Sequence, residues 1–166
     1  MWKIQLFKLN FDQREAQAAK EVIESGWLTM GERIAEFESN FSKFLGSGAQ
    51  CTAVANGTAA LHMALLALDI KPEDEVIIPA LTFVADANVV RMVGAKPVLA
   101  DCTSLENWNM SADTIAAKIT PKTKVVIIVH YAGFPCDMVS ISELCRTQGI
   151  KLIEDVAHAP GATWNG

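Results

Sequence analysis

From residue 51 onward, the sequence alternates short apolar runs with segments of helical periodicity. The pattern predicts strands at residues 51–55, 75–78, 97–100, 124–129 and 150–153, and helices at residues 58–68, 84–93, 111–119 and 140–148. Most residues of these strands are apolar, and Val125–Val129 is entirely so, which is typical of strands that are buried on both faces. We therefore expect an α/β fold, in which a mostly parallel sheet has helices on both faces.

Two further helices are expected before the first of these strands, at residues 12–25 and 32–45. The first begins with a capping box at Asp12 and ends at Gly26. The second carries an apolar stripe along one side and ends at Gly46. A helical pair therefore precedes the expected sheet.

The composition excludes several classes of protein. Apolar residues make up 51% of the chain and charged residues 20%, a balance that excludes intrinsic disorder. The net charge of −5 comes without a basic patch, so we expect no nucleic-acid partner. The apolar stretches are too short to cross a bilayer and the N-terminus lacks a signal-peptide pattern, so we expect no membrane association and a cytoplasmic location. Four cysteines without C-x-x-C spacing and three scattered histidines predict no metal site.

The residues that follow each expected strand are the candidates for chemistry, because sheets of this kind bind ligands beyond the carboxyl ends of their strands. Gly57, Thr58 and Ala59 follow the first expected strand and open a helix, whose N-terminal N–H groups suit a phosphate. The alternative is an ordinary turn in which Thr58 is the helix N-cap. The motif alone does not decide between the two.

Three more candidates follow other strands. Phe83 could stack on a planar ligand or belong to the core. Asp155, beside Glu154, could face a ligand or serve as a helix cap or a structural ion pair, and His158 could be a buried donor or a ligand contact. Neither a P-loop nor a dinucleotide-binding fingerprint is present, so a Walker-type metal role for the acid and Rossmann-type NAD or FAD binding are disfavoured.

Together these features describe one site at the carboxyl ends of three strands, with a phosphate cradle, an aromatic plate and a carboxylate. A flat, phosphorylated, nitrogen-containing ring would engage all three groups. Pyridoxal phosphate (PLP) has this chemistry, because its phosphate suits a helix N-terminus, its ring suits a stacking face and its pyridine nitrogen suits an anion.

The chain closely resembles the nucleotide-sugar aminotransferases of the DegT/StrS type, a family of PLP enzymes of fold type I. The resemblance covers nearly the whole chain. Its most specific stretches are Asn-Gly-Thr-Ala-Ala-Leu-His at residues 56–62 and Ile-Glu-Asp-Val-Ala-His-Ala-Pro-Gly-Ala at residues 153–162. Further stretches similar to the family are residues 25–31, 37–38, 73–85, 94–98, 119–124 and 129–133.

The resemblance implies a function and a role for each candidate residue. It implies a homodimeric enzyme that moves an amino group from an amino acid, commonly glutamate, to a keto group of a nucleotide-linked sugar. Gly57–Ala59 would then form the cradle for the PLP phosphate, and Phe83 would stack on the ring. Asp155 would pair with the pyridinium nitrogen and His158 would lie near the ring's 3-hydroxyl, which makes these two the candidate catalytic residues.

The resemblance also implies that residues 1–166 are the N-terminal part of the large, PLP-binding domain. The lysine that forms the Schiff base with PLP and the small C-terminal domain are not among these residues, and all ten lysines precede Asp155. We therefore expect this stretch to be inactive alone. Two alternatives stay open: a dehydratase or isomerase variant of the family, in which histidine replaces the lysine, and a non-catalytic fragment with a role in interaction or regulation.

Overall fold

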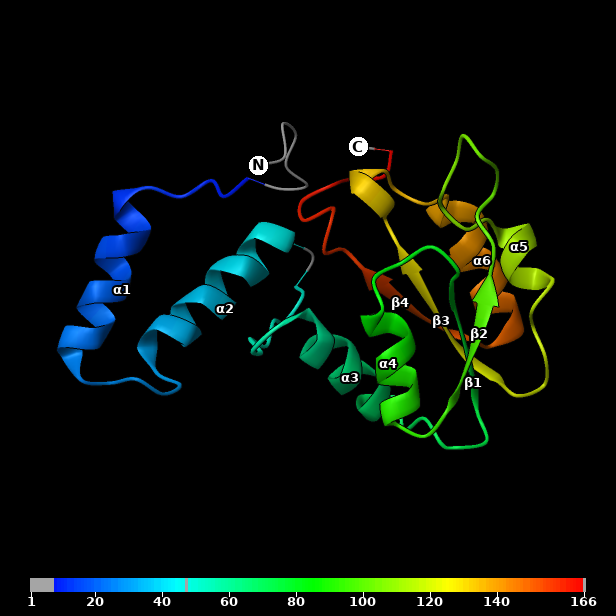
Figure 1. The fold of residues 1–166 in the computed structure, drawn as a ribbon, viewed down its shortest axis with the longest axis horizontal. Coiled ribbons are helices and arrows are strands. Elements are labelled where there is room, and N and C mark those ends of the chain that lie inside the picture. Colours follow the sequence, from blue (N-terminus) through cyan, green and yellow to red (C-terminus); the bar gives the residue numbers. More distant parts are fainter. Residues whose placement is uncertain (1–7, 47, 166) are drawn as a thin grey trace, which may run out of the picture. The chain divides into compact units, whose positions relative to one another are not determined.

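The computed structural model describes residues 8–46 and 48–165, which form two compact units (Figure 1). The first unit extends to Ala53 and the second begins at Val54.

The first unit contains the two expected helices, α1 (Gln13–Ser25) and α2 (Glu32–Leu45). The capping box at the start of α1 is present. The Asp12 side chain accepts a hydrogen bond from the Arg14 N–H in the first turn, and the Glu15 side chain accepts one from the Asp12 N–H at 2.7 Å. Gly26 ends α1 in the left-handed region, with φ of 74°, where glycine avoids the strain of a Cβ atom. The predicted helical pair is therefore confirmed.

The second unit is built on four parallel strands in the order β2-β1-β3-β4. The strands are β1 (Glu75–Pro79), β2 (Lys96–Ala100), β3 (Thr123–Val129) and β4 (Lys151–Asp155). The helices are α3 (Gly57–Ala67), α4 (Ala85–Met92), α5 (Ala112–Ala116) and α6 (Met138–Gln148), with a short 3₁₀ turn η1 (Tyr131–Gly133).

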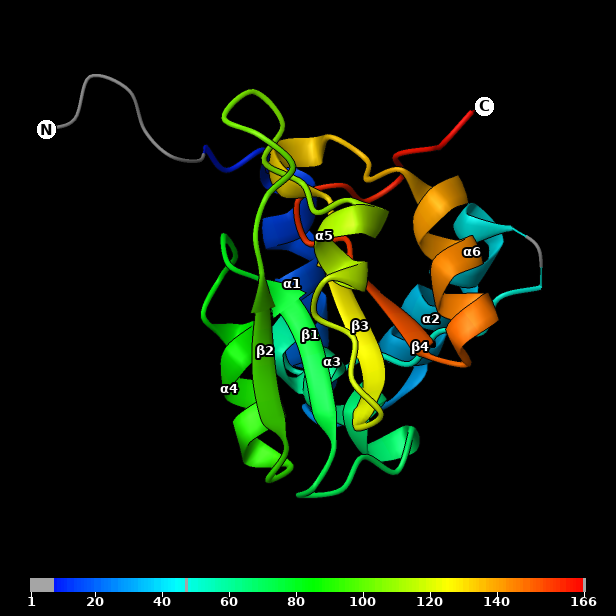
Figure 2. The ribbon, with the colours of Figure 1, turned by 90° about the vertical axis from the view of Figure 1, so that its right-hand side faces the viewer.

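Helices cover both faces of this sheet (Figure 2). Along β1 and β3, successive side chains enter two different cores because side chains alternate across a strand. One core joins the strands to α3 and α4, through residues such as Leu65 and Val89. The other joins them to α5 and α6, through residues such as Ile115 and Ile141. The expected α/β fold with a parallel sheet between two helical layers is confirmed.

The strand expected at residues 51–55 is not present. This segment lies before α3, and none of the four described strands pairs with it. An apolar run becomes a strand only where a neighbour accepts and donates its backbone hydrogen bonds. The prediction was therefore wrong in placing Gly57–Ala59 after a strand, although the helix that these residues open is present.

Two helix starts differ from the expectation. Asn56, not Thr58, is the N-cap of α3, and its side chain accepts a hydrogen bond from the Ala59 N–H. α6 begins at Met138 rather than at Ser140, because Asp137 caps it by accepting from both the backbone N–H and the hydroxyl of Ser140. Asparagine and aspartate are strong N-caps, and they stand two and three residues, respectively, before the expected helix starts at residues 58 and 140.

Candidate active site

The candidate residues of the second unit lie around the edge of the sheet at which its strands end. Since all four strands are parallel, they end at the same edge of the sheet, which we call the carboxyl edge. The last residues of β1 to β4 are Pro79, Ala100, Val129 and Asp155. α3 is followed by a short loop into the start of β1 at the opposite edge. The N-terminus of α3 therefore faces the carboxyl edge, as Figure 1 shows.

The first turn of α3 offers free backbone donors. Among the described residues, no acceptor pairs with the N–H of Gly57 or Thr58, whereas the Ala59 N–H donates to the Asn56 side chain at 2.9 Å. A Cβ atom added at Gly57 would meet no atom within 4 Å. This open helix start can accept an anion on two N–H groups and the helix dipole.

Phe83 lies in the loop between β1 and α4, and 71% of its surface is exposed. The alternative that Phe83 belongs to the core is therefore wrong. An exposed ring next to the carboxyl edge can stack on a planar ligand.

Asp155 is the last residue of β4 and is half-buried. Its Oδ1 atom accepts a hydrogen bond from the Ala157 N–H at 2.9 Å, and no cation among the described residues pairs with its side chain. Glu154, by contrast, pairs with buried His130, whose Nε2 atom lies 3.1 Å from Glu154 Oε2. A structural partner is therefore present for Glu154, whereas the Asp155 side chain pairs only with the Ala157 N–H among the described residues.

His158 lies in the loop after β4, where the backbone fixes its ring. The Ala132 N–H donates to His158 Nδ1 at 3.2 Å, so the proton of a neutral ring stands on Nε2. The ring meets Tyr131 edge-on, with centroids 5.6 Å apart, and Tyr131 meets Trp108 in the same way, also at 5.6 Å. The segment between β2 and α5, η1 and the loop after β4 therefore each contribute one ring to an aromatic row that includes the His158 ring.

Asp86, a fully buried acid in the first turn of α4, is a site residue that the sequence did not predict. The Thr82 hydroxyl donates to its Oδ2 atom, and Oδ1 has no hydrogen-bond partner among the described residues. Burial raises the pKa of Asp86 to about 6; the Thr82 hydrogen bond opposes the rise and the negative charge of Asp155 adds to it. No motif signals this residue, since an Asp in a first helical turn is usually exposed.

The structure brings some of the predicted residues together and leaves others apart. Asp155 lies close enough to Asp86 to affect its ionisation, and His158 belongs to the aromatic row beside η1. Phe83 and Gly57–Ala59 reach the same edge from β1 and α3, without a hydrogen bond or aromatic contact to Asp155.

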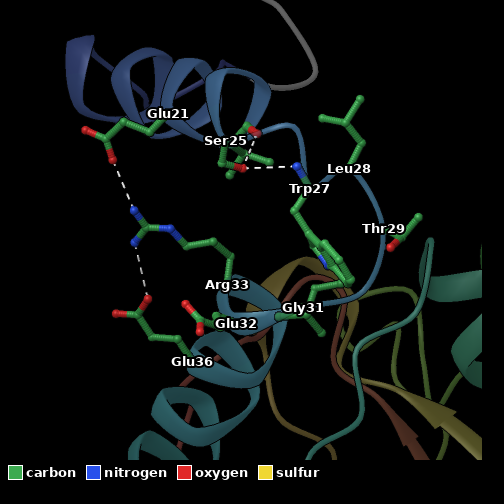
Figure 3. Close-up of a pocket in the computed structure, with 11 residues that line it drawn as sticks. Glu21, Ser25, Trp27, Leu28, Thr29, Gly31, Glu32, Arg33 and Glu36 are labelled. Carbon is green, nitrogen blue, oxygen red and sulfur yellow. Dashed lines mark hydrogen bonds and ion pairs between the residues drawn. The ribbon is translucent and has the colours of Figure 1, made fainter.

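The first unit holds a hollow of its own between α1 and α2, with a volume of about 830 Å³ (Figure 3). Arg33 bridges the two helices there, 3.0 Å from Glu21 and 3.3 Å from Glu36. The Trp27 indole N–H donates to the Met30 carbonyl at 2.9 Å. Arg33 thus pairs with two of the three acids that line the hollow, and the third, Glu32, lies in the first turn of α2.

No helix within the described residues is long and apolar enough to cross a membrane.

This chain is similar in sequence to one family of aminotransferases and to a synthase. Residues 10–166 match the DegT/DnrJ/EryC1/StrS aminotransferase family. GDP-perosamine synthase of Escherichia coli O157:H7 is 40% identical over 164 residues, which are 98% of this chain and 44% of that protein.

Two solved structures extend the comparison. The aminotransferase TlmJ from Streptoalloteichus hindustanus superposes with a TM-score of 0.92 at 38% identity, over 98% of this chain and 44% of that one. NtdA from Bacillus subtilis, with bound cofactor PMP, gives a TM-score of 0.84 at 32% identity, over 91% of this chain and 34% of that one. This chain spans less than half the length of each of these relatives. With a match from residue 10 to residue 166, the chain belongs to the DegT/DnrJ/EryC1/StrS aminotransferase family.

Proposed function

We propose that this chain is the N-terminal part of the cofactor-binding domain of a PLP-dependent aminotransferase, which acts on a keto group of a nucleotide-linked sugar. Membership of the family and the 40% identity to GDP-perosamine synthase support the reaction class and the class of substrate. An amino acid would donate the amino group, and the resemblance to the family implies that this donor is commonly glutamate. Because the chain covers 44% of that relative, the remaining machinery, including the lysine that binds PLP, would come from further residues of the protein.

The observation that carries the proposal is a set of three groups near the carboxyl edge that have no charged or aromatic partner among the described residues. The free N–H groups of Gly57 and Thr58 suit a phosphate, the exposed ring of Phe83 suits a stacked aromatic, and the unpaired carboxylate of Asp155 suits a cationic nitrogen. The three groups fit PLP, whose aminated form PMP is bound in the NtdA structure. When bound, PLP supplies an electron sink for the carbon that loses a proton.

Each residue would have a distinct task in holding the cofactor. Gly57 and Thr58 would bind the phosphate, and Ala59 would contribute the helix turn rather than a free donor, since its N–H is already paired with Asn56. Asp155 would hold the proton of the ring nitrogen in place, because a nearby anion favours the protonated form. His158, with its proton on Nε2, would donate a hydrogen bond to the oxygen next to the reacting carbon.

We also propose a homodimer and a cytoplasmic location. Exposed apolar side chains such as Trp27, Leu28 and Phe44 support a buried interface, and four free cysteines are typical of a reducing compartment. Light scattering on the full-length protein should give twice the mass of one chain, and a monomeric mass with full activity would contradict the homodimer.

The decisive experiment compares Asp155→Asn with Glu154→Gln in the full-length protein. Asp155→Asn should bind PLP more weakly and lower kcat/KM for amino transfer to a nucleotide-linked keto sugar by at least about a hundredfold. Glu154→Gln changes the adjacent carboxylate, which belongs to the His130 pair, and should keep PLP affinity within about threefold of the wild type. Equal PLP affinity and turnover in the wild type and Asp155→Asn would contradict the proposed function.

A further inference from the structure

Asp86 is a buried acid for which the proposed function has no task. Its side chain is fully buried, and one of its two carboxyl oxygens, Oδ1, has no partner among the described residues. The other oxygen accepts the Thr82 hydroxyl, and no cation in the described part of the chain faces either one. A buried charge without a counter-charge is costly, so the site requires either a proton on Asp86 or a positive group nearby.

The position of Asp86 in the fold indicates where that positive group would lie. Ile153 packs into the core beneath α3 and α4, and Asp155, two residues later on β4, points to the same face of the sheet. Asp86 lies in the first turn of α4, on that face and at the carboxyl edge. The negative charge of Asp155 helps to raise the pKa of Asp86, so a cation bound at Asp155 would act on Asp86 in the opposite direction.

The other charged groups on the elements that pack against α4 do not face Asp86. Glu75 and Lys96 pair with each other at 2.9 Å, at the starts of β1 and β2 and thus at the opposite edge. Asp101 follows β2 at the carboxyl edge, but its side chain accepts from the Cys102 N–H at 2.8 Å. Two further titratable groups, His62 on α3 and Arg91 in the last turn of α4, make no hydrogen bond or ion pair with Asp86.

We propose that Asp86 is a positioning residue behind Asp155, which releases its proton to solvent when a cationic ring nitrogen binds at Asp155. In that step the carboxylic acid of Asp86 becomes a carboxylate, the proton goes to water, and no other bond changes. The charges of two carboxylates then stabilise the protonated nitrogen, so that it keeps its proton to a higher pH than Asp155 alone would allow. This inference rests on the proposed function, because the cation is the ring nitrogen of PLP.

The test measures protons released when PLP binds to the full-length, cofactor-free protein, by calorimetry in two buffers of different ionisation enthalpy. PLP titrates by itself, so the informative quantity is the wild-type value minus that of Asp86→Asn. An acid with a pKa of about 6 is half protonated at pH 6, so the difference should be about half a proton at pH 6 and near zero at pH 8.

Two further variants keep the result interpretable if Asp86→Asn folds poorly. Thr82→Val keeps the acid but removes the hydrogen bond that lowers its pKa, so it should release more protons than the wild type at pH 7. Asp113→Asn removes an exposed acid from the first turn of α5 and should release as many protons as the wild type.

This inference would be overturned if the wild type, Asp86→Asn and Thr82→Val all bound PLP tightly and released equal numbers of protons at pH 6 and 7. That result would leave the proposed function intact. A wild-type protein that fails to bind PLP would contradict both.

Discussion

At the scale of single residues, the buried carboxyl group of Asp86 should make the stability of the cofactor-free protein depend on pH. Its pKa rises from 3.8 to about 6 on folding, so the folded chain binds more protons than the unfolded chain between these values. The free energy of unfolding should therefore fall as the pH rises through this window, by about 3 kcal/mol for a shift of about two units. In Asp86→Asn this loss should be absent, which denaturant titrations at pH 4 and pH 7.5 can measure.

Glu75 is a control for this prediction, because its pKa is shifted in the opposite direction to that of Asp86. The Thr120 hydroxyl and Lys96 hold the pKa of Glu75 below its usual value, so its carboxylate stabilises the fold at neutral pH and loses this effect in acid. Asp86→Asn should be more stable than the wild type at pH 7.5, and Glu75→Gln should be less stable. If the two substitutions changed stability in the same direction at pH 7.5, the assignment of opposite pKa shifts would be wrong.

At the scale of helices and turns, two glycines that start helices should respond differently to alanine. A Cβ atom at Gly31 would lie 2.5 Å from the Trp27 Nε1 atom and would displace the indole from its hydrogen bond to the Met30 carbonyl. The exposed indole can move aside, so we expect Gly31→Ala to destabilise the start of α2 by the loss of this hydrogen bond, about 1 kcal/mol. Hydrogen exchange at the amides of Ile34 and Ala35, which donate to the Gly31 carbonyl, should become faster.

Gly57→Ala is the matched control, because a Cβ atom at Gly57 meets nothing within 4 Å. This substitution should leave the fold unchanged or stabilise it slightly, while PLP affinity falls if the first turn of α3 binds the phosphate. Exchange at Ile34 and Ala35 that stays slow in Gly31→Ala would contradict the steric argument for Trp27.

The sequence predicted most of these elements because their signals are local. Periodicity, the capping box at Asp12 and the glycines that end α1 and α2 depend only on neighbouring residues, and all are present in the structure. The strand expected at residues 51–55 required a pairing partner, which a local pattern does not specify. Asp86 was missed for the same kind of reason, since its burial and its proximity to Asp155 arise only when α4 packs against the sheet.

At the scale of the whole molecule, the second unit has a chemical polarity that follows from its parallel sheet. Its lysines all stand at strand starts or in the segments that lead into them, at the edge opposite Asp155: Lys71, Lys96, Lys118, Lys122, Lys124 and Lys151. The candidate cofactor residues stand at the carboxyl edge. Glu75–Pro79 and the other strands of five residues span about 17 Å, a distance that a lysine side chain does not bridge.

This separation predicts which lysines PLP can label. Borohydride reduction of the full-length protein with PLP, followed by peptide mass mapping, should place no stoichiometric label on any lysine between Val54 and Asn165. The reason is geometric: the helix start at Gly57 and the carboxylate of Asp155 would fix the two ends of the cofactor at the carboxyl edge, away from every lysine of the second unit. Full labelling of Lys151 or Lys124 would mean that the cofactor binds at the edge of the sheet opposite the carboxyl edge. The roles proposed for Phe83 and Asp155 would then be wrong.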